Sequence, residues 1–336
     1  MKYEFESAPS PAQPIVVCDG IQWLNMPLPF ALNHVNCWLL GEPDEQTLID
    51  TGVDDVDTRG HWQSVFSHFG SWPRHLLATH FHPDHIGLAG WFEAQGCQKF
   101  SGSEIEIDIA HALWASDDLA YAEIYERWYQ EHELPDEVVQ TALNNGNTYR
   151  GKVHRPPAKE QWSYLVEGQR LEIAQRQYQV IIGRGHAPDM IMLYRSDDRV
   201  LIAADQVLPG ISPNVSVMPR LQDNNPLDSF LQTLEALAQL PEDTLVLPSH
   251  GLPFRGLHER IQVLREHHDV RLQQVCDACS EPRSAHALFP ILFRRALDAQ
   301  QTSFALGESL AHLHYLEHQA KIVRLQENGI TRFLAT

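Results

Sequence analysis

The sequence contains little cysteine and no long apolar run. None of its apolar segments is long enough to cross a bilayer as a helix, and residues 1–14 are polar and proline-rich, unlike a secretory signal. The five cysteines are an odd number without the spacing of a disulfide framework, which suits a reducing compartment. We therefore expect a cytoplasmic protein that makes no membrane contact.

Two of these cysteines, Cys276 and Cys279, form a C-x-x-C pair inside a helical pattern. Such a pair can bind zinc or act in redox chemistry, but no second pair and no βαβ pattern accompanies it here. We therefore interpret both as small residues near one face of a helix.

Positive charge is also scarce. The chain has 25 Lys and Arg residues against 44 Asp and Glu residues, a formal net charge of −19. This field repels nucleic acid, so a broad phosphate-binding surface is not expected, although a local basic groove is compatible with it. The same field favours a bound divalent cation, and 19 histidines offer many candidate ligands.

Hydrophobic patterning predicts two β-rich stretches separated by a helical one. Buried strands are expected at residues 37–40, 47–49, 76–79, 178–182, 200–203 and 244–247. Residues 104–160 instead show helical patterns at 109–114, 121–129 and 136–143, and we interpret them as an insertion. Its aromatic stripe fits either the core of a helix or a cap that contacts substrate, and consists of Tyr121, Tyr125, Trp128 and Tyr129.

The C-terminal part of the chain is helical and then β. Helices are expected at 259–276, 284–293 and 305–318, and Asn328-Gly329 between two apolar runs predicts a hairpin. Three helices followed by a hairpin indicate a winged helix, so we divide the chain into a catalytic domain at 1–256 and a winged-helix-like domain at 257–336. Apolar Leu306, Leu310 and Leu313 on the third helix favour packing against the catalytic domain over DNA recognition.

Metal-ligand residues are densest at 79–85, where Thr-His-Phe-His-Pro-Asp-His follows an apolar run. Polar groups crowded at the end of a buried strand cost free energy unless a cation binds them. Four further residues repeat this strand-end placement: Asp50, His186, Asp205 and His250. If the strands are neighbours, these residues converge at one edge of the sheets.

The spacing within this cluster suggests two metal ions. His80 and His82 are two residues apart, which suits an extended segment, while Asp84 and His85 follow as the chain turns into a helix. We expect one ion at His80, His82 and His186, a second at Asp84, His85 and His250, and a bridging role for Asp205. Imidazole and carboxylate ligands suit Zn²⁺ and are compatible with Fe or Mn.

Residues 79–87 resemble the H-x-H-x-D-H signature of the metallo-β-lactamase superfamily. Asp50 before this segment, and His186, Asp205 and His250 after it, occupy the places of that family's other motifs along the chain. The resemblance covers about residues 16–254 and implies an α/β fold, the αβ/βα sandwich with metals at one edge. It also implies that Asp50 orients ligands and is not itself one. Residues 205–214, with the winged helix, resemble a bacterial hydrolase subgroup similar to the mitochondrial lactamase-beta-like endoribonuclease.

Two positions depart from the family pattern. Zinc β-lactamases usually carry cysteine at the position of Asp205, so antibiotic hydrolysis is not expected. Many relatives also carry a histidine shortly after the His186 motif, where this chain has Ala187-Pro188-Asp189-Met190.

These observations predict a hydrolase that uses two divalent metal ions. The ions would lower the pKa of a bridging water to about 7, the hydroxide would attack a carbonyl or phosphoryl centre, and Asp84 would accept or relay the proton. The expected substrate is a small ester, thioester or lactone. Phosphodiester cleavage and nucleic-acid binding through the winged helix are the alternatives, and a homodimer is compatible with the sequence.

Overall fold

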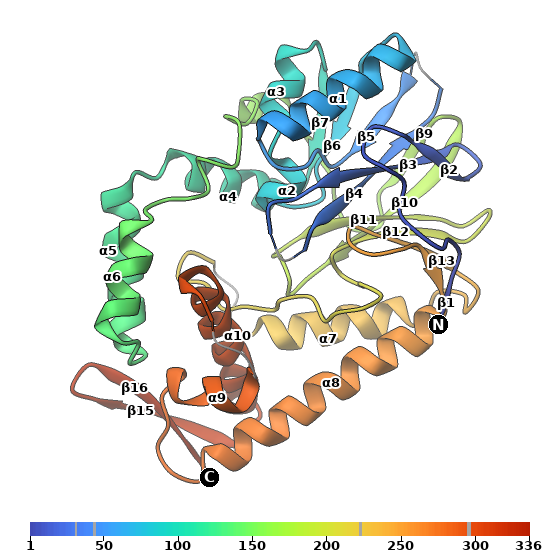
Figure 1. The fold of residues 1–336 in the computed structure, drawn as a ribbon. Coiled ribbons are helices and arrows are strands. Elements are labelled where there is room, and N and C mark those ends of the chain that lie inside the picture. Colours follow the sequence, from blue (N-terminus) through green and yellow to red (C-terminus); the bar gives the residue numbers. More distant parts are fainter. Residues whose placement is uncertain (31, 43–44, 222–223, 294–296) are drawn as a thin grey trace.

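The computed structural model describes the chain except residues 31, 43–44, 222–223 and 294–296. Two seven-stranded sheets form its centre, with helices on their outer faces (Figure 1). Side chains alternate along β4 (His34–Leu40), so that Trp38 and Leu40 pack between the sheets while Cys37 and Leu39 face the outer helices. The four layers are therefore helix, sheet, sheet and helix, as the αβ/βα prediction required.

The first sheet runs in the order β2 (Ile15–Cys18), β3 (Ile21–Pro27), β4, β5 (Thr47–Ile49), β6 (His75–Leu77), β7 (Lys99–Gly102) and β8 (Trp162–Tyr164). Helices α1 (Val56–Phe69), α2 (Pro83–Ile86) and α3 (Ala89–Ala94) belong to this half. β5 and β6 are parallel, so the residues that follow them emerge side by side.

The second sheet runs in the order β1 (Lys2–Tyr3), β14 (Phe254–Arg255), β13 (Leu245–Pro248), β12 (Val200–Ala204), β11 (Met190–Arg195), β10 (Arg176–Gly183) and β9 (Arg170–Ile173). Helices α7 (Pro226–Leu237) and α8 (Leu257–Ala278) cover its outer face (Figure 1). β12 and β13 are parallel, which again places two strand ends together.

The insertion contains α4 (Glu104–Ala115), α5 (Asp118–Glu131) and α6 (Asp136–Asn144). Its aromatic stripe faces the C-terminal region: Tyr125, Trp128 and Tyr129 are buried in one core cluster with the C-terminal helices. The Tyr129 hydroxyl donates to Ser303 Oγ, 3.1 Å away. This placement favours the helix-core interpretation of the stripe over substrate contact, and of its four members only Tyr121 is half-buried.

The C-terminal region consists of α8, α9 (Phe289–Leu292), α10 (Ala299–His318), and the strands β15 (Ile322–Glu327) and β16 (Ile330–Ala335). The hairpin predicted at Asn328-Gly329 is confirmed, and the apolar side of α10 is buried as predicted. The third helix begins earlier than predicted because the Asp298 side chain caps it, accepting from Gln301 N. The second is shorter, a 3₁₀ turn at His286–Leu288 followed by α9. Among the described residues, no helix is long and apolar enough to cross a membrane.

Candidate metal centre

The structure brings all seven predicted ligands together at one edge of the two sheets. Four come from the segment between β6 and α3, one from the loop between β10 and β11, and one each from the ends of β12 and β13. Their ligand atoms form three overlapping groups, each within 4.8 Å: His80, His82 and His186; His80, His85 and Asp205; and Asp84, His85 and His250. The spacing of parallel strand ends explains this convergence.

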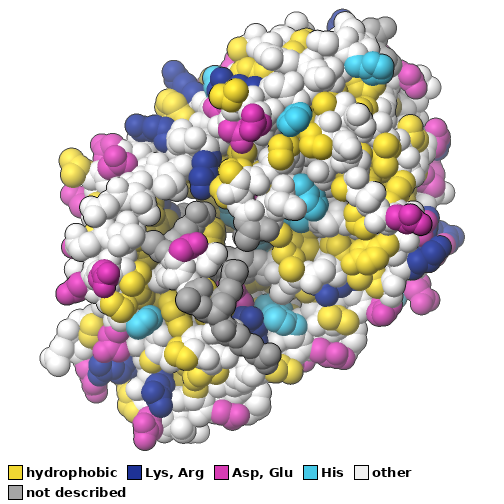
Figure 2. Space-filling model, in the orientation of Figure 1, with side chains coloured by type: hydrophobic (Ala, Val, Ile, Leu, Met, Phe, Trp, Pro, Cys, Tyr) yellow, Lys and Arg dark blue, Asp and Glu magenta, His cyan; other side chains and the backbone are white. Residues whose placement is uncertain are grey.

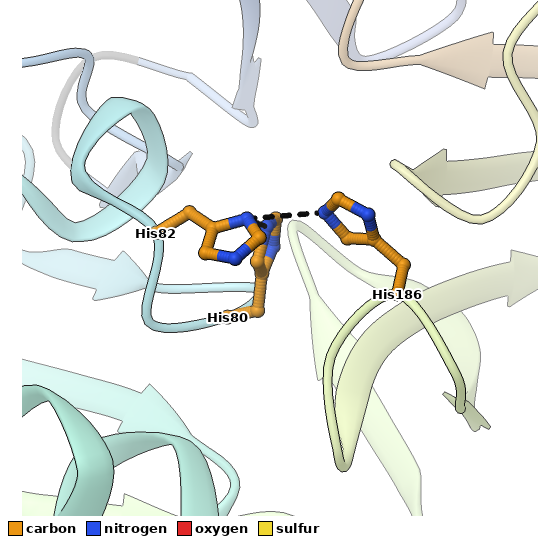
Figure 3. Close-up of side chains that lie close together, drawn as sticks. All are labelled: His80, His82 and His186. Carbon is orange, nitrogen blue, oxygen red and sulfur yellow. Dashed lines mark hydrogen bonds between the residues drawn. The ribbon is translucent and has the colours of Figure 1, made fainter. Parts of the chain in front are cut away.

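The first group consists of three imidazoles directed at one another from two loops (Figure 3). His82 Nδ1 lies 3.0 Å from His80 Nε2 and 3.1 Å from His186 Nε2. These distances are close to the separation of about 3.3 Å expected for two nitrogens bound tetrahedrally to one zinc ion.

Hydrogen bonds on the far side of the rings show which nitrogens carry protons. His186 Nδ1 lies 2.8 Å from the main-chain oxygen of Asn214, which can only accept, so this nitrogen is the donor. Thr79 Oγ1 donates to Asp50 and therefore accepts from His80 Nδ1, 3.0 Å away. In the neutral rings, Nε2 of both His80 and His186 consequently carries a lone pair and no proton.

The three nitrogens that face one another have too few protons to form hydrogen bonds among themselves. His82 Nδ1 faces two lone pairs but can donate to only one of them. A cation shared by the three nitrogens would satisfy all of them at once. The first group therefore fits a metal ion better than it fits hydrogen bonding alone.

The second group combines imidazoles with carboxylates. Nε2 of His85 lies 3.5 Å from Asp84 Oδ2 and 3.6 Å from Asp205 Oδ1. His250 Nε2 lies 3.4 Å from Asp84 Oδ2 and 3.5 Å from Asp205 Oδ2. His85 Nε2 and Asp205 Oδ1 are buried without a hydrogen-bond partner among the described residues, so both are open to a cation.

Asp205 lies between the two groups. Its Oδ2 is 3.4 Å from His186 Nε2 in the first group and 3.5 Å from His250 Nε2 in the second. A carboxylate in this position can serve two cations at once, which is the bridging placement expected from the sequence.

The field of the carboxylates attracts positive charge to the second group. Burial opposes the charged form of His85, but Asp84 and Asp205 outweigh it and raise its pKa to about 9. Burial likewise opposes ionisation of Asp205, yet His250 and His85 hold the pKa of this carboxyl below its ordinary range. In the first group, burial and the neighbouring rings lower the pKa of His82 to about 3. That group is therefore neutral and retains its lone pairs for a metal.

Asp50 lies outside the ligand groups but contacts their supports. Its carboxylate accepts from Thr79 N, from Thr79 Oγ1 and from His85 Nδ1, each at 2.8 Å. These contacts fix the ring of His85 and direct its Nε2 towards Asp84 and Asp205. The orienting role implied by the family resemblance agrees with this geometry.

Three supporting groups were not predicted from the sequence. Glu106 of α4 is 1% exposed and accepts from Phe81 N at 3.0 Å and from Asp189 N at 2.7 Å, so it joins the two loops that carry ligands. Burial raises the pKa of Glu106 to about 7 against the effect of these two donors. The others are main-chain oxygens, of Asn214 for His186 and of His34 for His250 at 2.7 Å. Main-chain acceptors have no residue-type signal, and nothing in the sequence distinguishes Glu106 from neighbouring acids.

With this geometry established, comparison with known proteins gives the class. The chain belongs to the metallo-beta-lactamase superfamily, whose family model matches residues 31–250. Residues 272–336 match a second model, described as the metallo-beta-lactamase-like C-terminal domain. The C-terminal region is thus a domain type associated with this superfamily, and the description of that family does not name a winged helix.

Particular relatives extend the comparison. A beta-lactamase domain protein from Burkholderia ambifaria is 37% identical, with a TM-score of 0.90 over 100% of this chain and 98% of that one. A metallo-beta-lactamase family protein from Thermus thermophilus is 30% identical, with a TM-score of 0.82 over 96% of this chain and 100% of the other. Acyl-coenzyme A thioesterase MBLAC2 from Homo sapiens is 26% identical, over 69% of this chain and 78% of its own length. These similarities support a metallo-hydrolase without specifying the substrate.

Proposed function

We propose that this protein is a hydrolase that binds two divalent metal ions and cleaves a small ester, thioester or lactone. The observation that carries the proposal is the convergence of three neutral imidazoles on one point and of two imidazoles and two carboxylates on an adjacent point. One ion would be held by His80, His82 and His186, the other by Asp84, His85 and His250, with Asp205 between them.

Divalent ions in such a site polarise a substrate oxygen and lower the pKa of water to about 7. The protein's own part is orientation and proton transfer. Asp84 is the more exposed of the two carboxylates, with 16% of its side chain accessible against 7% for Asp205. Asp84 is therefore the group placed to accept or relay a proton between substrate and solvent.

Thioesters are the favoured members of this substrate class. The human relative is named an acyl-coenzyme A thioesterase, and its similarity covers 69% of this chain. Phosphodiester cleavage, the activity suggested by the resemblance to the endoribonuclease subgroup, is the second candidate. The net charge of −19 disfavours it, and on the face shown in Figure 2 Lys and Arg side chains are interspersed with Asp and Glu.

We further propose that the C-terminal region, taken as a winged-helix-like domain, acts by packing and does not read DNA. The support is that Leu306, Leu310 and Leu313 of α10 are each no more than 1% exposed. This helix therefore has its apolar side committed to the core.

An activity panel tests the proposal. Protein loaded with Zn²⁺, Mn²⁺ or Fe²⁺ would be assayed on acyl-coenzyme A thioesters, p-nitrophenyl esters and lactones, and on bis-p-nitrophenyl phosphate and single-stranded RNA. We expect chelator-sensitive cleavage of the first set, lost in His186→Ala and kept in His68→Ala, which removes an exposed histidine of α1. Cleavage of RNA or the phosphodiester alone would contradict the substrate assignment, and full activity without metal would contradict the mechanism.

A further inference from the structure

The ring orientation of His186 depends on a segment that reaches from the second sheet to the C-terminal region. Its Nδ1 donates to the main-chain oxygen of Asn214, in the irregular chain between β12 and α7. That segment packs against the C-terminal helix α10: Val217 N donates to the main-chain oxygen of Gly307 at 3.0 Å. The position of the Asn214 oxygen is therefore set partly by the C-terminal region.

Side chains of α10 and α8 add to this attachment. Asn214 Nδ2 lies 3.4 Å from Glu308 Oε2, and the other carboxylate oxygen of Glu308 accepts from Arg271 Nη1 at 2.5 Å. The side chains of Glu308 and Arg271 are only 15% and 19% exposed. Because a charge-assisted hydrogen bond in this partly buried position is strong and directional, Arg271 holds Glu308 in the orientation that meets Asn214.

The close approach of the segment to α10 requires a glycine. A Cβ at Gly307 would lie 2.8 Å from Ser216 Cβ and 2.9 Å from the Val217 oxygen. Ser216 Oγ in turn donates to Asn214 Oδ1 at 2.5 Å, which fixes the Asn214 side chain. Any side chain at position 307 would push this segment away from α10.

We propose that Glu308 and Gly307 of the C-terminal region are positioning residues for the metal centre, because they fix the Asn214 oxygen that orients the His186 ring. The inference rests on the proposed function only in that His186 is taken as a metal ligand. It makes the C-terminal region part of one metal site and not of both. His250 in the other group is oriented by the main-chain oxygen of His34, on β4 of the catalytic fold.

The test measures metal affinity in the full-length protein, by titrating zinc-loaded protein with a competing chelator. Glu308→Ala and Gly307→Ala should each weaken one of the two ions about tenfold, the lower end of the range for loss of an outer hydrogen-bond partner, and leave the other unchanged. Glu308→Gln retains an oxygen that can accept from Asn214 and should recover part of the loss. Cobalt-substituted protein should show an altered visible spectrum in the two alanine variants.

Two controls separate positioning from general loosening. Glu317→Ala removes a charge of the same helix that pairs with Arg324, away from the Asn214 segment. Leu316→Ala empties a core position of α10 nine residues beyond Gly307, so it destabilises the region away from the point where Gly307 meets Val217. Both controls should bind the two ions with wild-type affinity.

The inference is overturned if Gly307→Ala and Glu308→Ala keep both affinities, or if Leu316→Ala loses as much as they do. A wild-type protein that binds no metal would overturn it together with the proposed function. A wild-type protein that binds two ions and shows the predicted variant pattern, but cleaves none of the substrates, would support the inference and count against the proposed function alone.

Discussion

Individual side chains determine the chemistry of this site through the protons they carry. The Thr79 hydroxyl illustrates this, since it donates to Asp50 and therefore accepts from His80 Nδ1. The hydrogen bond from His80 Nδ1 to this hydroxyl fixes the tautomer of the His80 ring. Nε2 of His80 therefore presents a lone pair to His82 and His186. A hydroxyl that binds no metal thus decides whether a neighbouring ring can do so.

Thr79→Val should remove this control while keeping the shape of the side chain. We expect metal affinity to fall about 10- to 100-fold, the range seen when outer-shell partners of a ligand are removed, and Thr79→Ser to stay near wild type. Chelator competition measures both values. Equal affinity in the valine and serine variants would show that the hydroxyl does not set the tautomer.

Glu106→Ala should destabilise the fold as well as the site. The change removes the acceptor of Phe81 N, which is buried, and of Asp189 N, which is partly buried, and a buried donor left unsatisfied costs about 1–3 kcal/mol. Urea unfolding of the metal-free protein measures the loss. The matched control is Glu104→Ala, an exposed acid in the same first turn of α4, for which we expect a change within about 0.5 kcal/mol. A similar effect in both variants would refute the bracing role of Glu106.

Strand ends explain why ligands so distant along the chain meet. β5 and β6 are parallel neighbours in one sheet, and β12 and β13 in the other, so Asp50, the segment from Thr79, Asp205 and His250 emerge at matching edges. The loop between β10 and β11 supplies His186 from the same side. It makes a tight turn at Gly185, whose φ is +100°.

Gly185→Ala should disturb this turn. A Cβ there would lie 2.4 Å from Phe230 Cβ and 2.5 Å from the Pro226 oxygen, in addition to the strain of a positive φ. We expect the free energy of unfolding to fall by more than about 2 kcal/mol, with weaker binding at the His186 site. In Gly168→Ala the φ is also positive, at +75°, but no atom lies within 4 Å, so only the strain of about 1–2 kcal/mol should appear. If thermal and urea unfolding give equal losses for both variants, crowding at Gly185 is not the cause.

Much of this arrangement was predictable from residue type and spacing. The dense segment at 79–85 and the acids and histidines directly after apolar runs are visible in the sequence, and so is the hairpin at Asn328-Gly329. The supports were not, because Asn214 and His34 act through main-chain oxygens and Glu106 accepts from main-chain donors. The aromatic stripe of α5 illustrates a different limit. Periodicity shows that a face is apolar but does not identify its partner, here the C-terminal helices.

In the whole molecule, the helical insertion packs against the C-terminal region. Helices α5 and α6 lie next to α10 and the hairpin (Figure 1). Glu133, in the turn between these two helices, pairs with Arg332 of β16, Nη2 to Oε1 at 2.5 Å. Between α8 and α10 two histidines are buried against each other, His268 Nδ1 lying 3.3 Å from His312 Nε2. Burial lowers the pKa of His268 to about 2 and that of His312 to about 4.

These two rings should make stability depend on pH. Their pKa values in the folded protein lie below the ordinary value of 6.5, so the unfolded chain binds more protons as the pH falls. The contribution of the two rings to the free energy of unfolding is therefore complete above about pH 6.5. It decreases towards pH 4, by up to about 1.4 kcal/mol per pH unit for each ring. The positive charges of Arg271 and His267 also face the pair and lower the pKa of both rings further.

His312→Gln, which carries no titrating ring, should reduce the slope of unfolding free energy against pH between about 6.5 and 4. Urea unfolding of metal-free wild type and variant at several pH values gives the difference. The exposed substitution His68→Gln serves as the control and should keep the wild-type slope. Identical slopes for all three proteins would mean that the buried pair does not contribute.

The central claim is that seven side chains from both sheets hold two divalent ions at adjacent points. Anomalous diffraction from crystals of the zinc-reconstituted protein tests it most directly. The account predicts two ions per chain, one bound by His80, His82 and His186 at about 2.0–2.1 Å, with only the other left in His186→Ala. Crystals that show no ion at these residues after reconstitution, or ions bound elsewhere, would contradict it.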